Sequence, residues 1–537
     1  MDRRRNRVAP QYAVWKRLVL IPMLLVAACS SPDVVQTTTP NPTAIIASTP
    51  TAAPIPTAIP NPKAGPTPTA IPIIPLAPTP TAIPTPTPAP IPTAISVPTV
   101  APTSTPIPTP TATPAPTAIP IIPLAPAPTF AVSTTFDSFS EETQRTFTTT
   151  VDNEFTAAYQ TAGVSAAVFD GKKLWTEGFG IASNTNQMTP TTPMNIRSTS
   201  KTFLSAMMLT QIEDGLYELT DTVETLLSDH PDYALIDIDY VNTDVTVEQL
   251  LTMTSGISDW SAPEDLDKRI EIMLAPTWKP ADNLSKISSP FIKPGSYHYS
   301  WANSILLGLI TTHKGGKNIN ALYQETFFEP LGLSGGLLTE VAQPLDMAAA
   351  YDNLAKYGGE SVFGELSTGP MAIFKGKDPR ISWAGAGIVS TPENIARWGF
   401  ELFSSSGSAL SSAAQAQLIN SLTVETDPSM SGIGVHTYGY YIGMADVSLS
   451  DGTRIKTYTH PGGGGGRTSH LYYAPSLDVS ISLLANSMAL HDMGSCGYQG
   501  TEDYMSVGEC MAGGIFSTLL GMPVEQTVTG AAGKSGY

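Results

Sequence analysis

Side chains that bind metals are scarce in this chain of 537 residues. It has seven histidines and three cysteines, and they are scattered along the sequence. A zinc site needs such ligands at short, regular spacings, and no segment provides them. The sequence therefore predicts neither a metal nor another cofactor.

Basic residues are also few, and their distribution argues against a nucleic-acid partner. Six of the 28 Lys and Arg residues lie in the first 17 positions. Without residues 1–29, the chain keeps 22 Lys and Arg against 45 Asp and Glu, a net charge of −23. A protein this acidic repels phosphate backbones. The acidity most simply keeps an extracytoplasmic protein soluble.

Long apolar runs are missing after the N-terminus. Residues 1–29 combine six basic residues with the apolar run LVLIPMLLVAAC, the pattern of a secretory signal. Its end at Cys29 resembles a bacterial lipoprotein signal, in which the cysteine is lipid-modified and starts the mature chain. An uncleaved anchor helix is the alternative, although the run is short for a bilayer and contains Pro22. Both interpretations predict a protein held at the cell membrane, on its extracytoplasmic face.

Two common enzyme motifs are absent. The chain has no G-x-S-x-G segment, which disfavours an α/β-hydrolase. The glycine run 462–466 is not a phosphate-binding loop, because Pro461 takes the place of the first glycine of that motif and Arg467 that of its lysine.

Composition divides the chain into four parts. Charge is nearly absent between Thr37 and Thr129, where Pro and Thr dominate and PTAIPIIPLAP occurs twice. Such a segment favours extended polyproline II and cannot build a core. We expect a signal segment at 1–29, a disordered linker at 30–135, a globular domain at 136–525 and a flexible tail at 526–537.

The globular part mixes helical and strand patterns. Strands near both ends of the domain enclose a helical middle, which predicts an α+β fold with an antiparallel sheet flanked by helices, plus a helical subdomain. The predicted elements are a helix over 140–163, a hairpin over 165–180, a short helix over 245–256 ending at Gly256, a hairpin over 470–487 and a helix over 503–521.

Ser198 and Lys201 form the only Ser-x-x-Lys in the chain, at the start of an apolar helical pattern. Residues three apart share a helix face, so the lysine amine is expected one turn from the serine hydroxyl. A desolvated lysine can act as the base for such a nucleophile. A capping serine followed by a solvated lysine is the alternative.

Two later segments make the pattern more specific. Tyr299 precedes an apolar helical pattern, and His460-Pro461-Gly462 precedes a predicted hairpin. In this order the three motifs resemble the Ser-x-x-Lys, Tyr-x-Asn and Lys-Thr-Gly or His-x-Gly motifs of the serine β-lactamase and penicillin-binding superfamily. The resemblance covers about residues 140–520. It is greatest to the branch of class C β-lactamases, D-alanyl-D-alanine carboxypeptidases and related esterases.

The resemblance assigns roles to these residues. Ser198 is the acylated nucleophile, and Lys201 and Tyr299 handle its proton, either of them being the resting base. His460 is a cationic or hydrogen-bonding neighbour.

An oxyanion hole is also implied by the resemblance. The backbone N–H groups of Ser198 and Gly463 form it, and Gly462 lines the same site.

The chain departs from the family at two places. Trp301 stands where the Tyr-x-Asn motif has its asparagine, so it lines the substrate site in place of an amide. Pro461 and Gly463 lack the hydroxyls that bind a substrate carboxylate in carboxypeptidases and β-lactamases. Both changes add weight to an esterase or an amidase.

Two cysteines remain if Cys29 carries lipid. Cys496 and Cys510 can pair in an oxidising compartment, and such a bond over a short loop stabilises by roughly 3 kcal/mol. Two free thiols are the alternative.

Together these features predict a membrane-anchored extracytoplasmic serine hydrolase of the D-alanyl-D-alanine carboxypeptidase type. Its substrate is a small molecule, a peptide or an ester, and the sequence does not predict an oligomeric state. An esterase or amidase of the same fold and a non-catalytic, envelope-binding module are the alternatives.

Overall fold

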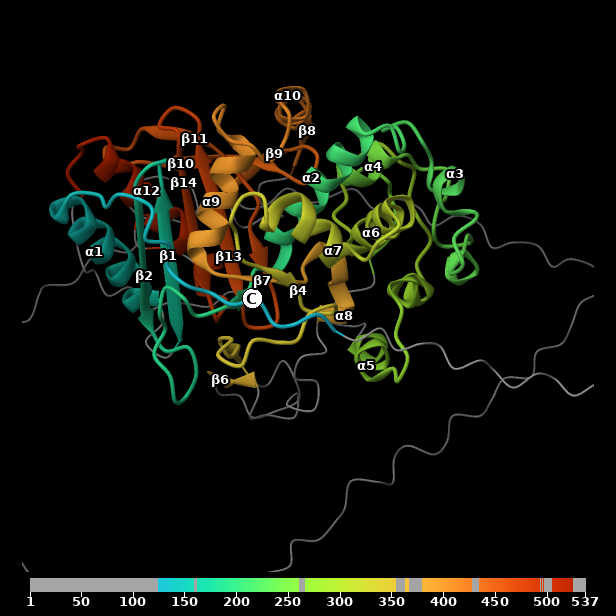
Figure 1. The fold of residues 1–537 in the computed structure, drawn as a ribbon, viewed down its shortest axis with the longest axis horizontal. Coiled ribbons are helices and arrows are strands. Elements are labelled where there is room, and N and C mark those ends of the chain that lie inside the picture. The colour runs from blue at the N-terminus through green and yellow to red at the C-terminus, as the bar shows by residue number, and fades with distance from the viewer. Residues whose placement is uncertain are drawn as a thin grey trace, which may run out of the picture. The chain divides into compact units, whose positions relative to one another are not determined.

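The computed structural model describes residues 124–158, 162–259, 266–353, 363–366, 379–426, 434–492, 494, 496 and 505–524 (Figure 1). The predicted signal segment with Cys29, most of the predicted linker and the predicted tail lie outside these residues. Within the described ranges, no helix is both long and apolar enough to cross a membrane.

A nine-stranded antiparallel sheet forms the centre of the fold. Its strands follow the order β2, β1, β14, β13, β11, β10, β9, β8, and β12 also pairs with β13. Both predicted hairpins are present, and the two ends of the domain meet where β1 pairs with β14. The bounds are β1 Gly163–Phe169, β2 Leu174–Gly180, β8 Val424–Glu425, β9 Val435–Tyr438, β10 Gly443–Ser448, β11 Arg454–Thr459, β12 Gly462–Gly463, β13 Thr468–Ala474 and β14 Val479–Ala485.

Helices cover both faces of this sheet, so its central strands are apolar on both sides. In β1, Ala166 and Val168 join one core, whereas Ala167 and Phe169 join the other. Helix α9 packs on one face, and α1 and α12 pack together on the opposite face (Figure 1). The bounds are α1 Glu141–Ala158, α9 Pro392–Phe403 and α12 Val507–Leu519.

A helical part lies beside the sheet, to its right in Figure 1. Two further antiparallel sheets, β3-β7-β4 and β5-β6, are small. These elements confirm the predicted α+β fold with an antiparallel sheet flanked by helices. Their bounds are α2 Ser200–Glu213, α3 Val223–Leu227, α4 Val247–Leu251, α5 Leu266–Leu274, α6 Trp301–Gly315, α7 Ile319–Tyr323, α8 Pro379–Ser382, α10 Ser412–Asn420, β3 Met194–Asn195, β4 Gly336–Leu337, β5 Tyr351–Asn353, β6 Phe363–Glu365 and β7 Ile388–Ser390.

Helix α4 is shorter than the sequence predicts. It ends at Leu251, not at Gly256. The left-handed residue that terminates it is Met253, with φ 57°. The N–H groups of Met253 and Thr254 bond back to the carbonyls of Leu250 and Gln249, which is the Schellman pattern. Glycine usually takes this position, so its absence there made the predicted end wrong.

The folded unit begins before residue 136. Ala125 exchanges backbone hydrogen bonds with the segment that contains Glu340 and Ala342, at 2.9 and 2.8 Å. The Ser133 N–H donates to the Glu393 carboxylate at 3.0 Å. The last twelve residues assigned to the linker therefore belong to the folded unit. Composition cannot reveal this boundary, because the contacts use the main chain.

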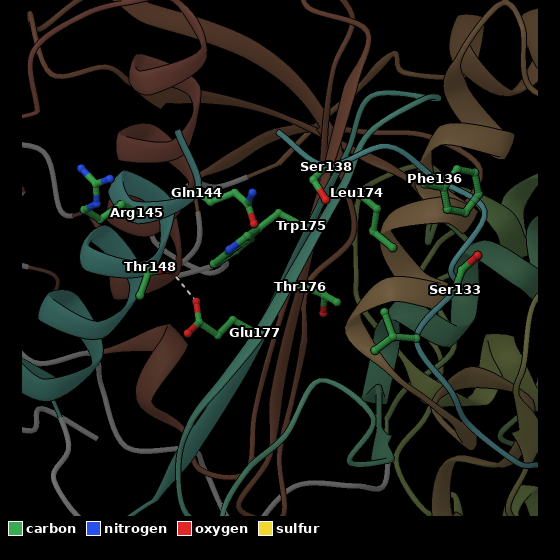
Figure 2. A pocket seen from close by; sticks show the side chains of 11 residues that line it. Ser133, Phe136, Ser138, Gln144, Arg145, Thr148, Leu174, Trp175, Thr176 and Glu177 are labelled. Carbon is green, nitrogen blue, oxygen red and sulfur yellow. Dashed lines mark hydrogen bonds between the residues drawn. The ribbon is translucent and has the colours of Figure 1, made fainter. Parts of the chain in front are cut away.

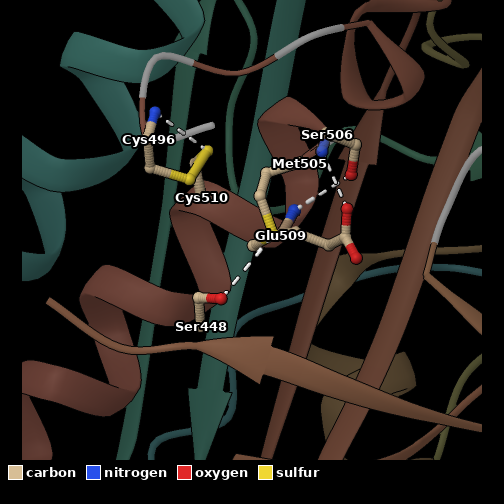
Figure 3. The surroundings of a disulfide bond; sticks show 6 residues. All are labelled: Ser448, Cys496, Met505, Ser506, Glu509 and Cys510. Carbon is tan, nitrogen blue, oxygen red and sulfur yellow. Dashed lines mark hydrogen bonds between the residues drawn. A yellow bond between two sulfur atoms is a disulfide. The ribbon is translucent and has the colours of Figure 1, made fainter. Parts of the chain in front are cut away.

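Cys496 and Cys510 form a disulfide, with their Cα atoms 5.5 Å apart. Cys510 lies in α12, whose N-terminus is capped by Ser506. Figure 3 shows the reciprocal bonds between Ser506 and Glu509 beside the disulfide. The bond thus attaches the chain before α12 to the helix itself.

A cavity of about 510 Å³ lies between α1, β2 and the segment that enters the domain (Figure 2). Thr148 from α1 and Glu177 from β2 meet across it in a hydrogen bond of 2.5 Å. None of the site residues predicted from the sequence lines this cavity.

Candidate active site

Ser198 lies in a single 3-10 turn, Arg197–Thr199, that leads directly into α2. The turn follows β3, and the Ile196 N–H extends the pairing of β3 with β7 by donating to Ile388. Helix α2 is buried on nearly all sides, and its Phe203 ring stacks on Trp398 at 3.8 Å. A helix buried in this way gives the serine a rigid base.

Lys201 lies one turn further along and is only 1% exposed. Its Nζ is 3.3 Å from Ser198 Oγ and 3.0 Å from the carbonyl oxygen of Gly385. Burial lowers the pKa of Lys201 to about 7, although the negative charge of Asp259 opposes this effect and the positive charge of Arg197 adds to it. The amine is therefore largely neutral in mildly alkaline solution.

Tyr299 precedes α6 and donates its hydroxyl proton to Ser198 Oγ at 3.0 Å. Its ring lies 5.0 Å from Lys201 Nζ. Burial raises the pKa of Tyr299 well above the usual range of a phenol. The structure thus brings Ser198, Lys201 and Tyr299 together, with the phenol in its protonated form.

His460 lies between β11 and β12 and is 3% exposed. Its Nε2 is 2.9 Å from the Tyr438 hydroxyl, and its Nδ1 is 2.8 Å from the Pro461 carbonyl oxygen. Burial, assisted by the charge of Lys201, lowers the pKa of His460 to about 3. The sequence left two roles open for His460. Its lowered pKa and its two hydrogen bonds favour a neutral hydrogen-bonding partner over a cation.

The glycines after His460 lie against the nucleophile. Strand β12 pairs Gly462 with Ser469 and Gly463 with Thr468 on β13. A Cβ at Gly462 would lie 2.7 Å from the backbone nitrogen of Ser198. Only glycine permits this approach. The oxyanion hole of Ser198 and Gly463 stays a prediction, which this proximity makes reasonable.

Trp301 is the first residue of α6 and is half-buried. Its N–H lies 3.4 Å from Asp259 Oδ1, at the start of the helix. Asn303 does not supply the missing amide, because it is fully buried and accepts a hydrogen bond of 2.7 Å from Ser255.

Several neighbours of the site were not predicted from the sequence. Gly385 accepts from Lys201, Tyr438 holds His460, and Asp259 and Arg197 set the charge around Lys201. Arg197 could have been found from the sequence, because it directly precedes Ser198. The other three come from distant segments without a motif. Among the residues that the structure describes, no group of three or more His, Cys, Asp or Glu could hold a metal ion.

Comparison with known proteins agrees with this geometry. The beta-lactamase family model matches residues 145–500. The unguisins hydrolase ungD of Aspergillus violaceofuscus is 25% identical over 390 residues, which are 68% of this chain and 62% of that protein. The D-aminopeptidase of Brucella anthropi is 28% identical over 243 residues, which are 44% of this chain and 41% of that protein. The chain thus spans about three fifths, or less, of the length of these curated relatives.

Solved structures share the fold. The D-amino acid amidase from Ochrobactrum anthropi SV3, complexed with D-phenylalanine, superposes with a TM-score of 0.55 at 19% identity. The match covers 71% of this chain and 99% of the amidase. The resemblance inferred from the three motifs is confirmed, and the chain belongs to the beta-lactamase family.

Proposed function

We propose that this protein is a serine hydrolase that cleaves an amide bond through an acyl-enzyme on Ser198. One observation carries the proposal: Lys201 Nζ and the Tyr299 hydroxyl both lie within 3.3 Å of Ser198 Oγ. A hydroxyl that only capped a helix would not need an enclosed amine and a phenol beside it.

Lys201 is the resting base in this scheme. Its neutral amine has a lone pair for the serine proton, whereas the phenol of Tyr299 has no such capacity while it keeps its proton. The Tyr299 hydroxyl instead stabilises the serine oxygen as it becomes negative. This assigns different roles to two residues that the sequence left interchangeable.

Acylation then follows with its atoms balanced. Ser198 Oγ bonds to the substrate carbonyl carbon while its proton passes to Lys201, and the carbonyl oxygen becomes an oxyanion beside the N–H groups of Ser198 and Gly463. When the carbon–nitrogen bond breaks, Lys201 returns the proton to the leaving amine, directly or through Tyr299. The products are a free amine and an ester on Ser198.

Deacylation uses water in the same way. Neutral Lys201 accepts a proton from the water that attacks the ester, and Ser198 recovers its proton when the acid leaves. An amidase and an esterase differ only in the group that leaves in the first step. The arrangement of Ser198, Lys201 and Tyr299 suits both activities, and the names of the D-aminopeptidase and the D-amino acid amidase favour an amide substrate.

The substrate we propose is an amide or short peptide with a free amine near the scissile bond and a D-configured residue. Asp259 places a negative charge close enough to influence Lys201, which favours a cationic substrate. Neutral His460 and the missing hydroxyls of Pro461 and Gly463 give little to hold a terminal carboxylate. This departs from the carboxypeptidase-like activity expected from the sequence. The names of the D-aminopeptidase and the D-amino acid amidase support the choice.

We also propose that the domain is lipid-anchored through Cys29 and faces outward on its Pro/Thr-rich linker. The basic and apolar pattern of residues 1–29 supports this, and a disulfide between Cys496 and Cys510 suits an oxidising compartment. Labelling bacteria with a fatty-acid analogue tests it. We expect label on the wild-type chain in the membrane fraction and none on Cys29→Ser, and label on both would refute lipidation at Cys29.

Four probes test the activity: D-phenylalanine amide, its N-acetyl derivative, a D-Ala-D-Ala peptide and an activated ester. We expect the free amide to be cleaved faster than its acetylated form and the peptide, with no turnover by Ser198→Ala. A preference for the peptide would restore the carboxypeptidase interpretation. A folded wild-type protein that cleaves none of them would instead favour the non-catalytic binding module.

A further inference from the structure

Arg197, the residue directly before Ser198, has an unusual conformation. Its φ is 50°, in the left-handed region that non-glycine residues rarely adopt, and its side chain is buried at 4% exposure. A large cationic side chain in a strained backbone position beside a nucleophile is unfavourable for stability.

The guanidinium lies beneath the glycine run that follows β12. A Cβ at Gly464 would be 3.1 Å from Arg197 Nη2, and one at Gly465 would be 3.8 Å away. Both glycines have positive φ, of 121° and 59°. The run therefore bends closely over the guanidinium, in backbone conformations that residues other than glycine rarely adopt.

A second contact fixes the other side of the guanidinium. Arg197 Nη1 donates to Asn195 Oδ1 at 3.4 Å. Asn195 in turn donates to the carbonyls of Ala386 and Ile388, at 2.8 and 2.9 Å. Gly385, the residue before Ala386, holds Lys201 Nζ. Arg197 thus connects three segments that surround the nucleophile.

The charge of Arg197 also acts on Lys201. Besides the Ser198 hydroxyl and the Gly385 carbonyl, five groups act on the Lys201 amine: the Asp259 carboxylate, the Arg197 guanidinium, the rings of Tyr299 and Tyr441, and His460. Asp259 favours the ammonium form, and Arg197 opposes it. His460 is neutral, so the cationic role that the sequence left open for it falls to Arg197.

We propose that Arg197 is a positioning residue that keeps the Lys201 amine unprotonated and holds the glycine run against Ser198. It acts through Lys201 and does not touch the substrate. The inference rests on the proposed function, since it concerns the base of that reaction. The inference goes beyond the proposed function, because it makes a positive charge outside the three motifs responsible for the protonation state of Lys201.

The test compares the pH dependence of acylation in four full-length proteins: wild type, Arg197→Lys, Arg197→Met and Arg397→Met. Acylation is followed with the activated ester under single-turnover conditions between pH 5 and 10. In a plot of acylation rate against pH, the acid limb is the rise in rate as Lys201 loses its proton. We expect Arg197→Met to move the midpoint of this limb to higher pH by more than about 0.5 pH unit, because a repulsive charge is lost. Arg197→Lys keeps the charge and should keep the limb within about 0.2 pH unit of wild type.

Arg397 provides the matched control. It also anchors backbone carbonyls, those of Leu331 and Gly332, but it belongs to α9, where it pairs with Glu393 and packs on the Phe136 ring. Arg397→Met should lower the unfolding temperature without moving the limb. If Arg197→Met does not fold, Arg197→Gln, which keeps a donor for Asn195, takes its place.

The outcomes separate this inference from the proposed function. A limb that stays in place in a folded, uncharged Arg197 variant would overturn the role of Arg197, even if its rate falls. A wild-type protein that never acylates Ser198 would instead overturn the function on which the inference rests.

Discussion

Lys201 Nζ lies 3.3 Å from Ser198 Oγ, and the amine has almost no contact with solvent. Because burial lowers the pKa of Lys201 to about 7, its protonated form dominates below that pH and has no lone pair to accept the serine proton. Acylation should therefore fall about tenfold for each pH unit below about 7 and level off above it. A rate that is flat from pH 5 to 9 would exclude a lysine base.

Replacing Lys201 should separate activity from stability. In Lys201→Met we expect acylation to drop by roughly 10²- to 10⁴-fold, the usual contribution of a general base. The folded pKa lies below the ordinary 10.5, so the unfolded chain binds the extra proton and the wild type loses stability as pH falls from about 10.5 to 7. The Lys201→Met variant has no amine to protonate and therefore does not lose this stability.

Thermal unfolding of the two proteins at pH 6 and pH 10 checks this second effect. The methionine variant should gain most over wild type at pH 6. A variant less stable than wild type at both values would mean that the amine contributes to folding through its bonds to Gly385 and Ser198.

Gly462 should tolerate no side chain. A Cβ there would lie 2.6 Å from the Ile196 carbonyl oxygen and 2.7 Å from the Ser198 nitrogen, and backbone atoms cannot move aside easily. We expect Gly462→Ala to lose about 1–3 kcal/mol of stability and most of its activity. Kinetics with the activated ester and thermal unfolding measure the two effects.

Gly452 is the control for that substitution. It has φ 83° and no atom near its Cβ position. Gly452→Ala should cost about 1 kcal/mol through backbone strain alone and leave the activity unchanged. If both variants lose stability but keep full activity, β12 is not part of the active site.

The hydrogen bond between Tyr438 and His460 can be used to test whether His460, in the third motif, carries a positive charge. Tyr438→Phe removes the 2.9 Å hydrogen bond to His460 Nε2 and should cost about 0.5–1.5 kcal/mol. Because the pKa of His460 is lowered to about 3, the imidazole stays neutral at working pH, so the acid limb of acylation should not move. A limb that shifts in Tyr438→Phe would show that His460 takes up a proton during catalysis.

The part of the site that could be predicted lies in continuous segments. Ser198 and Lys201 were predicted to meet because helix geometry fixes residues three apart. The hairpins and the sheet were predicted because their alternation and turn residues are local. Tyr299 and His460 are distant in sequence, and only the order of motifs in a known family suggested them.

The rest depends on burial and on main-chain contacts. Whether His460 is cationic or neutral cannot be read from its neighbours in sequence, since the fold sets its pKa. The early start of the folded unit at Ala125 rests on backbone hydrogen bonds that any residue can make. Helix α4 ended early because Met253 adopted a conformation that usually requires glycine.

The disulfide should stabilise the domain without taking part in its chemistry. Cys496 and Cys510 are 14 residues apart, and by the chain-entropy model a loop of this length contributes about 3 kcal/mol. We expect Cys496→Ser to lower the unfolding temperature and to make the protein insensitive to dithiothreitol, while wild type loses the same stability on reduction. Acylation of Ser198 should be unchanged in all folded samples, because α12 packs on the sheet face opposite α9 and contributes no side chain around Ser198. A reduced protein as stable as the oxidised one would mean that the bond adds nothing to a helix already anchored by its core residues Met511, Ile515 and Phe516.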